Sequence, residues 1–262
     1  MTFLNRVIEQ KRSEIAEKKV NMSKNDLKQM AARIPVRDFR AAISGKGKII
    51  AEIKKRSPRV HRFRNADAIH DLPRVYEETG AAAVSIVTDA LNFGTSLSDA
   101  RRVHEHVSIP ILVKDFILDE YQVHEARAFG ADGLLLIARI LDSQKLAELH
   151  ALTDELGMQA LVEVHDENDL RKALDAGAHT IGINNRDLDS LEVRVDTTRQ
   201  LIGHIPDSTT VVSESGIRGR SEILELSRLG VNAFLIGEAL LESDDPAKLL
   251  RQLLGKNGGT KH

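Results

Sequence analysis

Short apolar runs recur along the chain, and their first residues lie about 20 to 35 positions apart. The runs are nearly continuous in Ile, Val, Leu and Ala rather than alternating with polar residues, which is typical of parallel strands buried on both faces. The spacing leaves room for one helix and two loops between successive strands. We predict eight strands, over residues 49–54, 83–88, 111–114, 133–137, 159–164, 180–183, 210–214 and 232–236.

The segments between these runs have the pattern of helices. Apolar residues recur three and four positions apart in 119–131, 143–157, 166–178 and 219–231. Several of these stretches end in a glycine followed by Ala or Val, which is a common way to leave a helix through a left-handed turn. The glycines are Gly80, Gly130, Gly177 and Gly230.

Strand–helix alternation with apolar strands predicts a parallel sheet covered by helices. Eight such units favour an α/β fold of the closed (β/α)8 barrel type, the TIM barrel. An open, doubly wound sheet is the alternative, but it usually has fewer strands and often a glycine-rich first turn. The first turn here, "KKRSPRVHRF", contains no glycine.

The first 45 residues lie outside this repeat. "FLNRVIEQKRSEIAEKK" predicts a charged amphipathic helix, and "SKNDLKQMAARI" predicts a second one with Ser23 as its N-cap. These helices contain too few apolar residues for a core of their own. We therefore expect residues 1–262 to form a single barrel domain, of which 1–45 is an N-terminal helical extension packed on the barrel.

Composition narrows the class of protein. Apolar residues make up 42% of the chain, and the net charge of −2 gives no pull toward nucleic acid or acidic membranes. The chain has no cysteine, which excludes disulfides, thiolate nucleophiles and cysteine-bound zinc. The charged N-terminus does not resemble a signal peptide, and no apolar run approaches the roughly 20 residues that span a bilayer. We therefore expect a cytoplasmic protein. We also expect no metal, because the histidines are not spaced as metal ligands.

Charged and polar residues interrupt or follow several apolar strands where a barrel has its active site, at the carboxyl ends. Glu52 and Lys54 share one face of the first strand, because side chains alternate along a strand. A single charge of this kind is ordinary at a strand end, but burying so many unpaired would cost several kcal/mol each. They are therefore expected to neutralise one another or to bind a ligand, with pKa values shifted toward those useful for proton transfer. The others are Lys114, Glu163, Asn184, Arg186 and Glu214.

The turns after the last two strands predict a phosphate site. "SESGIRG" and "FLIGEALL" place Ser215, Gly216, Gly237 and Glu238 where barrels often bind phosphate. Glycine lets backbone N–H groups approach a phosphate closely, and the carboxylate of Glu238 does not oppose binding if only its backbone faces inward. The alternative is a pair of tight turns without a ligand.

Several stretches together identify a family. "IIAEIKKRSP", "SIPILVKDFILDEYQVHEARAFGADGLLLIARIL", "ALVEVHDENDLRKALDAGAHTIGINNRDL", "VVSESGI" and "LGVNAFLIGEALL" resemble indole-3-glycerol phosphate synthase, a barrel enzyme of tryptophan biosynthesis. "FLNRVIEQKRSEI" and "RDFRAAI" are similar to that family's helical extension. The resemblance implies a carboxy-lyase that closes the ring of 1-(2-carboxyphenylamino)-1-deoxyribulose 5-phosphate and releases carbon dioxide and water. It implies no cofactor and no metal.

The resemblance also implies roles for individual residues. Lys114 would be the general acid that protonates the substrate carbonyl, and Glu163 the base for dehydration. Glu52 would be a third catalytic residue, which orients and polarises the lysines and shares in proton transfer. A lysine can be that acid when burial or positive neighbours lower its pKa. The binding residues would be Lys54, Ser215, Gly216, Gly237 and Glu238 for the phosphate, Asn184, Arg186 and Glu214 for the sugar hydroxyls and aryl carboxylate region, and Ser57 and Phe116 for the anthranilate end.

Two loops depart from the family pattern. The family commonly has Ser-Pro-Ser followed by glycine after the first strand, whereas this chain has "SPRVHRFR", with Arg59 at the second serine. After the second strand, "TDALNFGTSLSD" keeps only Phe93, Gly94 and Ser96. The departures fit either variation within the family or an altered arylamine end of the substrate.

Three other functions stay open on the sequence. A paralogue could act on a different phosphorylated amino sugar. Phosphoribosylanthranilate isomerase shares the fold but would be expected to have a cysteine early in the chain. A non-catalytic barrel that binds phosphorylated ligands would not need the acid–base residues that are present. The expected partner is a phosphorylated small molecule, and the expected state is a monomer or weak homodimer.

Overall fold

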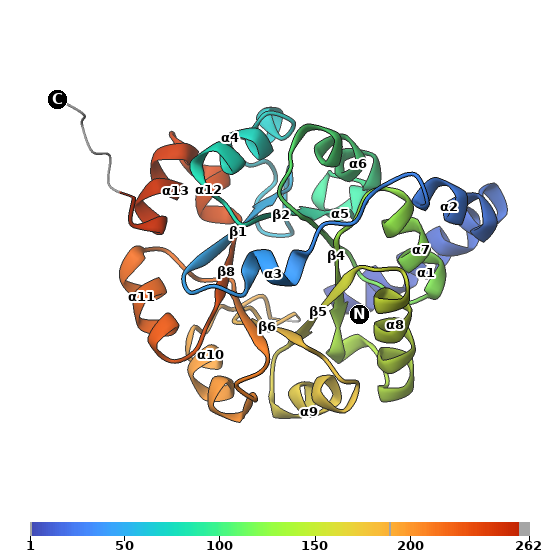
Figure 1. The fold of residues 1–262 in the computed structure, drawn as a ribbon. Helices are drawn as coiled ribbons and strands as arrows, with labels where there is room; N and C mark the ends of the chain where they lie inside the picture. Colours follow the sequence, from blue (N-terminus) through green and yellow to red (C-terminus); the bar gives the residue numbers. More distant parts are fainter. Residues whose placement is uncertain (1, 189, 257–262) are drawn as a thin grey trace.

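In a computed structural model that describes residues 2–188 and 190–256, eight parallel strands form a closed barrel in the order β1 to β8 (Figure 1). Every strand pairs with its neighbours in sequence, and β1 closes the ring against β8. The predicted TIM barrel is confirmed, and the open-sheet alternative is wrong. The strands are β1 (Lys48–Ile53), β2 (Ala83–Val87), β3 (Ile111–Lys114), β4 (Gly133–Ile137), β5 (Gln159–Val164), β6 (Thr180–Asn184), β7 (Thr210–Glu214) and β8 (Ala233–Ile236).

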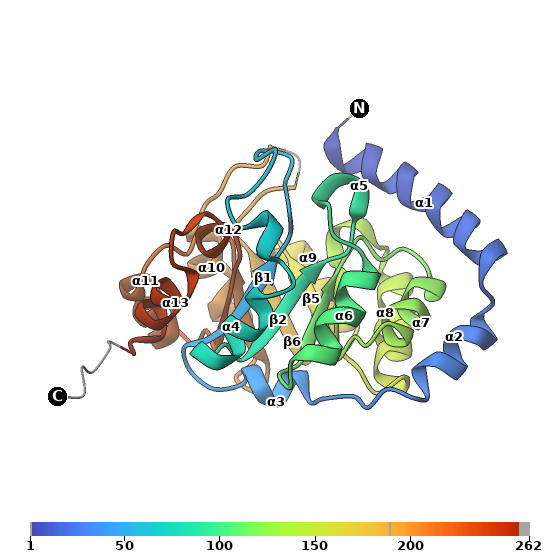
Figure 2. The ribbon, with the colours of Figure 1, turned by 90° about the horizontal axis from the view of Figure 1, so that it is seen from above.

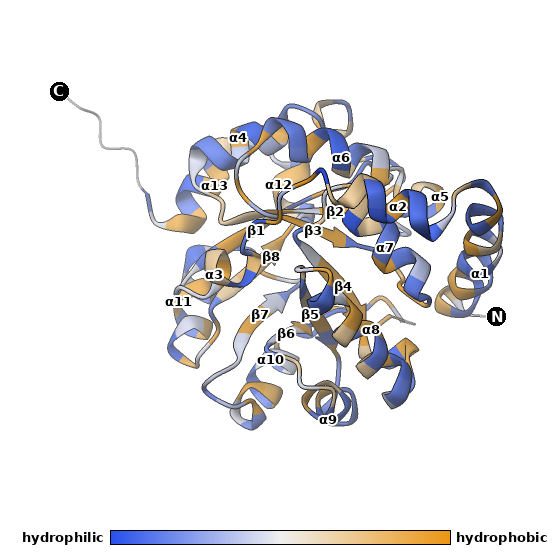
Figure 3. Ribbon diagram, turned by 45° about the vertical axis from the view of Figure 1, so that its right-hand side comes forward, coloured by the Kyte–Doolittle hydropathy of each residue, from blue (hydrophilic) through white to orange (hydrophobic). Residues whose placement is uncertain are grey.

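Helices surround the barrel and show an apolar and a polar face (Figure 3). The α-helices are α1 (Phe3–Asn21), α2 (Lys24–Ala31), α3 (Phe39–Ile43), α4 (Leu72–Thr79), α5 (Ala90–Phe93), α6 (Leu97–His106), α7 (Glu120–Ala128), α8 (Ser143–Glu155), α9 (Glu167–Asp175), α10 (Asp196–Leu201), α11 (Arg220–Arg228), α12 (Glu238–Glu242) and α13 (Pro246–Leu254). Short 3-10 turns are η1 (Ala66–Ala68), η2 (Ala138–Ile140) and η3 (Ile202–His204). None of these helices in the described ranges is long and apolar enough to cross a membrane.

Local signals explain where the helices begin and end. The Ser23 side chain accepts a hydrogen bond from the Asp26 backbone N–H, so the predicted N-cap of the second helix is confirmed. The four glycines that were predicted to end helices all adopt a positive φ, between 79° and 115°. A side chain is strained in that conformation, which is why glycine occupies these positions.

Because side chains along each strand point alternately into and out of the barrel, the inward-pointing residues form layers. Ile50, Leu112, Leu161 and Val212 of the odd-numbered strands pack inside the barrel in one apolar cluster. Because side chains alternate, the residue two positions further along each strand also points inward. In these four strands that residue is charged, so an apolar layer lies directly below a charged one.

Two of the N-terminal helices, α3 and α1, lie at opposite ends of the barrel. Phe39 and Ile43 of α3 are fully buried against interior residues and cover the end where the strands begin (Figures 1 and 2). A Cβ at position 133 would lie 2.9 Å from the Phe39 ring, so Gly133 makes room for it. α1 lies at the opposite end (Figure 2), where Phe3 reaches the cavity described below. Residues of α1 (Leu4, Val7) and α3 (Phe39, Ile43) belong to the same apolar cluster as the barrel interior.

A buried ion pair fixes α1. Lys11 is 3% exposed, and its Nζ lies 2.9 Å from Asp115 Oδ1, directly after β3. Burial acts to lower the pKa of Lys11, but Asp115 and Asp89 outweigh burial and raise it. Burial raises the pKa of Asp115, and Lys11 only partly offsets this. Removing one partner of a buried pair leaves the other charge uncompensated, so α1 depends strongly on this contact.

Lys11→Met is expected to lower the free energy of unfolding by about 3–5 kcal/mol, because it keeps the apolar stem but leaves Asp115 without its partner. The loss should be smaller at acidic pH, where the Asp115 carboxyl accepts a proton. Urea denaturation at two pH values measures both effects. Lys24→Met is the control, since its pair with Glu120 is about half exposed on both sides. Equal small losses in both variants would contradict the prediction.

Candidate active site

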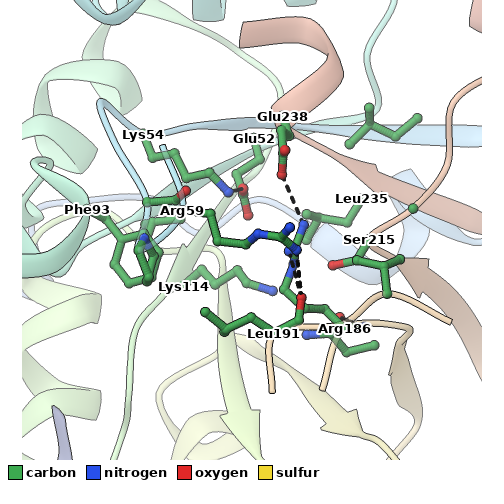
Figure 4. Close-up of a pocket in the computed structure, with 18 of the residues that line it drawn as sticks. Glu52, Lys54, Arg59, Phe93, Lys114, Arg186, Leu191, Ser215, Leu235 and Glu238 are labelled. Carbon is green, nitrogen blue, oxygen red and sulfur yellow. Dashed lines mark hydrogen bonds and ion pairs between the residues drawn. The ribbon is translucent and has the colours of Figure 1, made fainter. Parts of the chain in front are cut away.

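A cavity of about 500 Å³ opens at the carboxyl ends of the strands (Figure 4). Its walls come from strand ends, from the segments after β1, β2, β3, β6, β7 and β8, and from the start of α1. Of the thirteen site residues predicted from the sequence, those that line this cavity are Glu52, Lys54, Ser57, Lys114, Phe116, Glu163, Asn184, Arg186, Ser215, Gly216, Gly237 and Glu238. Glu214 is not among the described lining residues, because it lies behind Lys114 and is fully buried.

Four charged side chains form the inner layer of the barrel next to the cavity. Glu52, Lys114, Glu163 and Glu214 come from β1, β3, β5 and β7. Barrel interiors are built from layers of four side chains contributed by alternate strands. Such layers are usually apolar, whereas here one ammonium faces three carboxylates.

Lys114 contacts two of the other charged side chains in this layer. Its Nζ lies 3.1 Å from Glu163 Oε2 and also donates a hydrogen bond to Glu214 Oε2. Beside them, Lys54 Nζ lies 2.6 Å from Glu52 Oε1, which is the predicted pairing of two residues on one face of β1. All three carboxylates are at most 3% exposed. The ammonium groups are therefore held by buried carboxylates rather than by water.

The electrostatics of Lys114 differ from expectation. Burial acts to lower its pKa, but the carboxylates of Glu214, Glu163 and Glu52 outweigh burial and raise the pKa above its usual value. The expectation that burial or positive neighbours lower this pKa is wrong for the free protein, because the near neighbours are negative. Lys114 consequently holds its proton firmly.

The three carboxylates do not behave alike. Burial favours the neutral form of each, but Lys54 and Lys114 overcome it at Glu52 and lower its pKa. The pKa of Glu163 is likewise lowered, with Lys114 and His165 overcoming burial. At Glu214, burial prevails over Lys114 and raises the pKa to about 7. Two ammoniums cannot balance three carboxylates, and Glu214 is the carboxyl of the three that takes up a proton most readily.

Two glycines give the carboxylates room. A Cβ at Gly182 of β6 would lie 2.3 Å from Glu214 Oε1, and a Cβ at Gly237 would lie 2.5 Å from Glu52 Oε1. Gly237 was predicted for its backbone alone, whereas Gly182 was not predicted at all. The signal for Gly182 is its interior position, two residues before Asn184 on the same face of β6.

The turn after β7 has the backbone shape of an anion site. Ser215 and Gly216 both have positive φ, 64° and 83°. A left-handed conformation at a residue other than glycine is strained, and such residues gather at functional sites. Successive N–H groups in turns of this kind make concave anion sites. Glu238 lies opposite, and its side chain does face the cavity, where it accepts a 3.0 Å hydrogen bond from Arg186 Nη2.

Two arginines meet at the mouth of the cavity (Figure 4). Arg186 Nη1 and Arg59 Nη1 donate to the same carbonyl oxygen, that of Leu191, at 3.2 and 3.1 Å. Arg59 therefore joins the loop after β1 to the loop after β6, and these loops rise side by side in Figure 2. Within the described residues, no carboxylate lies within ion-pair distance of the Arg59 guanidinium.

Some lining residues were not predicted. Leu135, Ile137 and Leu235 are interior positions of even-numbered strands and could have been found from alternation along the strands. Phe3 could not have been identified from the sequence, because its position depends on how α1 packs. Across residues 2–188 and 190–256, no group of three or more His, Asp or Glu side chains is arranged to hold a metal ion. The arrangement offers an ammonium donor, carboxylate acceptors and an anion-binding turn around a partly apolar space.

Gly182→Ala tests whether the charged layer needs this glycine. The new methyl group would displace the Glu214 carboxyl, so we expect the free energy of unfolding to fall by about 1–3 kcal/mol, as in other overpacked interiors. Catalytic turnover should fall with it. Gly203→Ala is the matched control, because a Cβ there meets nothing within 4 Å. Chemical denaturation and turnover of both variants provide the measurement, and indistinguishable variants would refute the requirement.

Comparisons with known proteins agree with this site. The family model described as indole-3-glycerol phosphate synthase matches residues 4–253. The chain is 41% identical over 257 residues to the indole-3-glycerol phosphate synthase of Leptothrix cholodnii, covering 96% of this chain and 98% of that protein. It is 45% identical over 221 residues to that of Aquifex aeolicus, covering 83% and 86%.

A solved structure adds support for the fold alone. The tryptophan synthase alpha-subunit from Pyrococcus furiosus superposes with a TM-score of 0.62 at 18% identity, covering 80% of this chain and 99% of that one. The resemblance that the sequence motifs indicated is confirmed by the family match and by relatives that span nearly the whole chain. The chain belongs to the indole-3-glycerol phosphate synthase family.

Proposed function

We propose that this cavity closes the ring of 1-(2-carboxyphenylamino)-1-deoxyribulose 5-phosphate and releases one carbon dioxide and one water, giving indole-3-glycerol phosphate. The observation that carries this proposal is Lys114, a protonated ammonium held between buried carboxylates at the cavity floor. Ring closure needs an acid at a carbonyl oxygen, and dehydration needs an acid–base pair. Lysine and glutamate side chains around one cavity can supply both.

Lys114 acts as the general acid in this proposal. Its raised pKa keeps the proton in place until the substrate carbonyl arrives. The carbonyl oxygen gains negative charge as the aryl carbon attacks, and a fixed ammonium next to it stabilises that charge. The hydrogen bonds to Glu163 and Glu214 stop Lys114 from turning away, so its position is set before the substrate binds.

Glu163 acts as the base of the dehydration step. Its lowered pKa keeps it ionised at neutral pH, as a base requires. Glu163 Oε2 faces Lys114 Nζ at 3.1 Å, so acid and base lie within reach of the same substrate atoms. Glu52 holds Lys54 and adds negative charge next to Lys114, which is an orienting role.

The ends of the substrate are assigned by charge and polarity. The phosphate binds the turn at Ser215 and Gly216 and the backbone of Gly237 and Glu238, with Lys54 as the nearby cation. The Glu238 carboxylate faces the cavity but is paired with Arg186, which offsets its charge. The aryl ring lies toward Ser57 and Phe116. Asn184 and Arg186 contact the sugar hydroxyls and the aryl carboxylate region, and Glu214 acts from behind Lys114. We also propose one domain, a cytoplasmic location and a monomer or weak homodimer.

The loops at the mouth support one variation on this function. Arg59 replaces a serine of the family pattern, and its guanidinium reaches the cavity without a carboxylate partner among the described residues. An additional cation at that end favours a substrate with a carboxylate there. The paralogue with a different phosphorylated amino sugar differs from the main proposal only at this end.

Fluorescence of the indole product gives a direct assay of turnover. Wild-type protein should turn over the carboxyphenylamino deoxyribulose phosphate, while Lys114→Ala should lose roughly 10²–10⁴-fold in kcat, the contribution typical of a positioned acid or base. Lys28→Ala, at an exposed position on α2, is the control and should retain activity.

The outcomes separate the alternatives. Turnover that survives Lys114→Ala would contradict the proposed acid. No turnover by the wild-type protein, with inorganic phosphate still raising its melting temperature, would instead indicate a paralogue or a non-catalytic barrel. In that case, aryl amines with and without a carboxylate, added as ligands, would show what Arg59 selects.

A further inference from the structure

One buried histidine next to the proposed base has no role in the reaction as described so far. His165 follows β5 directly and lies two residues after Glu163, so both side chains turn to the same side. The His165 side chain is 3% exposed, and its Nε2 lies 3.3 Å from Glu163 Oε1. His165 does not line the cavity in the described structure, so it acts behind Glu163 and not on a ligand.

The other ring nitrogen faces a second carboxylate. His165 Nδ1 lies 3.5 Å from Asp169 Oδ2, which also accepts a 3.3 Å hydrogen bond from the His165 backbone N–H. Arg139 and Lys172 hold Asp169, with nitrogen–oxygen distances of 3.3 and 3.7 Å. Burial acts to raise the pKa of Asp169, but His165 and Arg139 outweigh it and keep the pKa low. The imidazole thus lies between two ionised carboxylates.

The contacts between these groups are close but not aligned. Glu163 Oε1, His165 Nδ1 and His165 Nε2 are buried, and within the described residues none has a hydrogen bond of good geometry. A buried polar atom without a partner is unusual and calls for an explanation. In unliganded active sites, catalytic hydrogen bonds are often long and tighten only when the substrate binds. Three such atoms in a row next to the proposed base fit that behaviour.

We propose that His165 is a positioning residue for Glu163. Nε2–H donates to Glu163 Oε1, which leaves Oε2 directed at Lys114 and the cavity, and Asp169 fixes the orientation of the ring. This inference rests on the proposed role of Glu163 as the base. Carboxylate–histidine pairs orient functional groups in the same way at metal sites, where the outer partner matters nearly as much as the ligand.

The same contacts extend to the loop that borders the cavity mouth. Arg139 of η2 contacts Asp166 and Asp169 at the start of α9 and also lies 3.2 Å from Asp187, next to Arg186. The orientation of Glu163 is therefore connected through His165 and Asp169 to the position of the loop after β6.

Removal of the His165 ring is expected to shift the pH dependence of kcat in one direction. The charged groups that face Glu163 are Lys114 of β3, Glu214 of β7 and Glu52 of β1. Asp169 of α9 faces His165 and is held by Lys172 of α9 and Arg139 of η2, and Arg139 also pairs with Asp166. Lys114 and His165 are the groups that overcome burial and lower the pKa of Glu163. Removal of the ring therefore raises this pKa. A base works only when deprotonated, so the acid limb of kcat moves to higher pH.

Three substitutions at one position test the proposal. His165→Gln keeps a donor near the place of Nε2, His165→Asn keeps one near the place of Nδ1, and His165→Leu keeps neither. We expect kcat to fall roughly 10- to 100-fold in His165→Leu and His165→Asn, the usual effect of losing an outer partner. His165→Gln should recover most of the loss. KM should change little, and the acid limb should move upward most in His165→Leu.

The controls distinguish three causes of lost activity: a folding defect, a wrong assignment of Glu163 as the base, and a wrong role for His165. Melting temperatures with and without inorganic phosphate show whether each variant still forms the phosphate site. Glu163→Gln tests the base itself, and unchanged turnover there would overturn the proposed function whatever His165 does. If Glu163→Gln is inactive while all three His165 variants keep the wild-type kcat and pH profile, the inference is overturned alone. The inference would also be overturned if all three His165 variants, including His165→Gln, lost activity in proportion to their loss of stability.

Discussion

The ammonium of Lys114 between three buried carboxylates is the interaction on which the rest of the site depends. Two lysines and three glutamates at the top of the barrel leave one negative charge in excess, and an isolated buried carboxylate is costly. The fold meets this constraint in two ways, by hydrogen bonds from Lys114 to Glu163 and Glu214 and by a raised pKa at Glu214. A barrel layer that is normally apolar is thereby kept ready for proton transfer.

Neighbouring parts of the fold adjust to this layer. Gly182 and Gly237 leave the space that the carboxyl groups of Glu214 and Glu52 occupy. Asp115, the next residue after Lys114, makes the buried pair with Lys11 that fixes α1 at the mouth of the barrel. The end of β3 thus sets both the charged floor of the cavity and the helix that borders it.

Much of this was accessible from the sequence, because each signal is local. Strand positions follow from apolar runs, helix ends from glycines such as Gly80 and Gly130, and the sharing of a face by Glu52 and Lys54 from alternation along one strand. The sequence predicted that the charges at the strand ends would neutralise one another, but not which would pair, and the contact between Lys114 and Glu214 joins residues a hundred positions apart. For the same reason the pKa of Lys114 was expected to move the wrong way. The direction of this pKa shift depends on which charges the closed barrel brings near Lys114.

The pH dependence of stability tests the central claim, that Glu214 carries the proton that balances the layer. Its pKa is raised from 4.5 to about 7 in the folded protein, so the folded state binds this proton more tightly than the unfolded state does. The contribution is fully present below pH 4.5 and is lost as the pH rises through 7. Relative to Glu214→Gln, the wild-type free energy of unfolding should therefore fall across this range, by up to about 1.4 kcal/mol per pH unit. A difference between the two proteins that stays constant with pH would contradict the account.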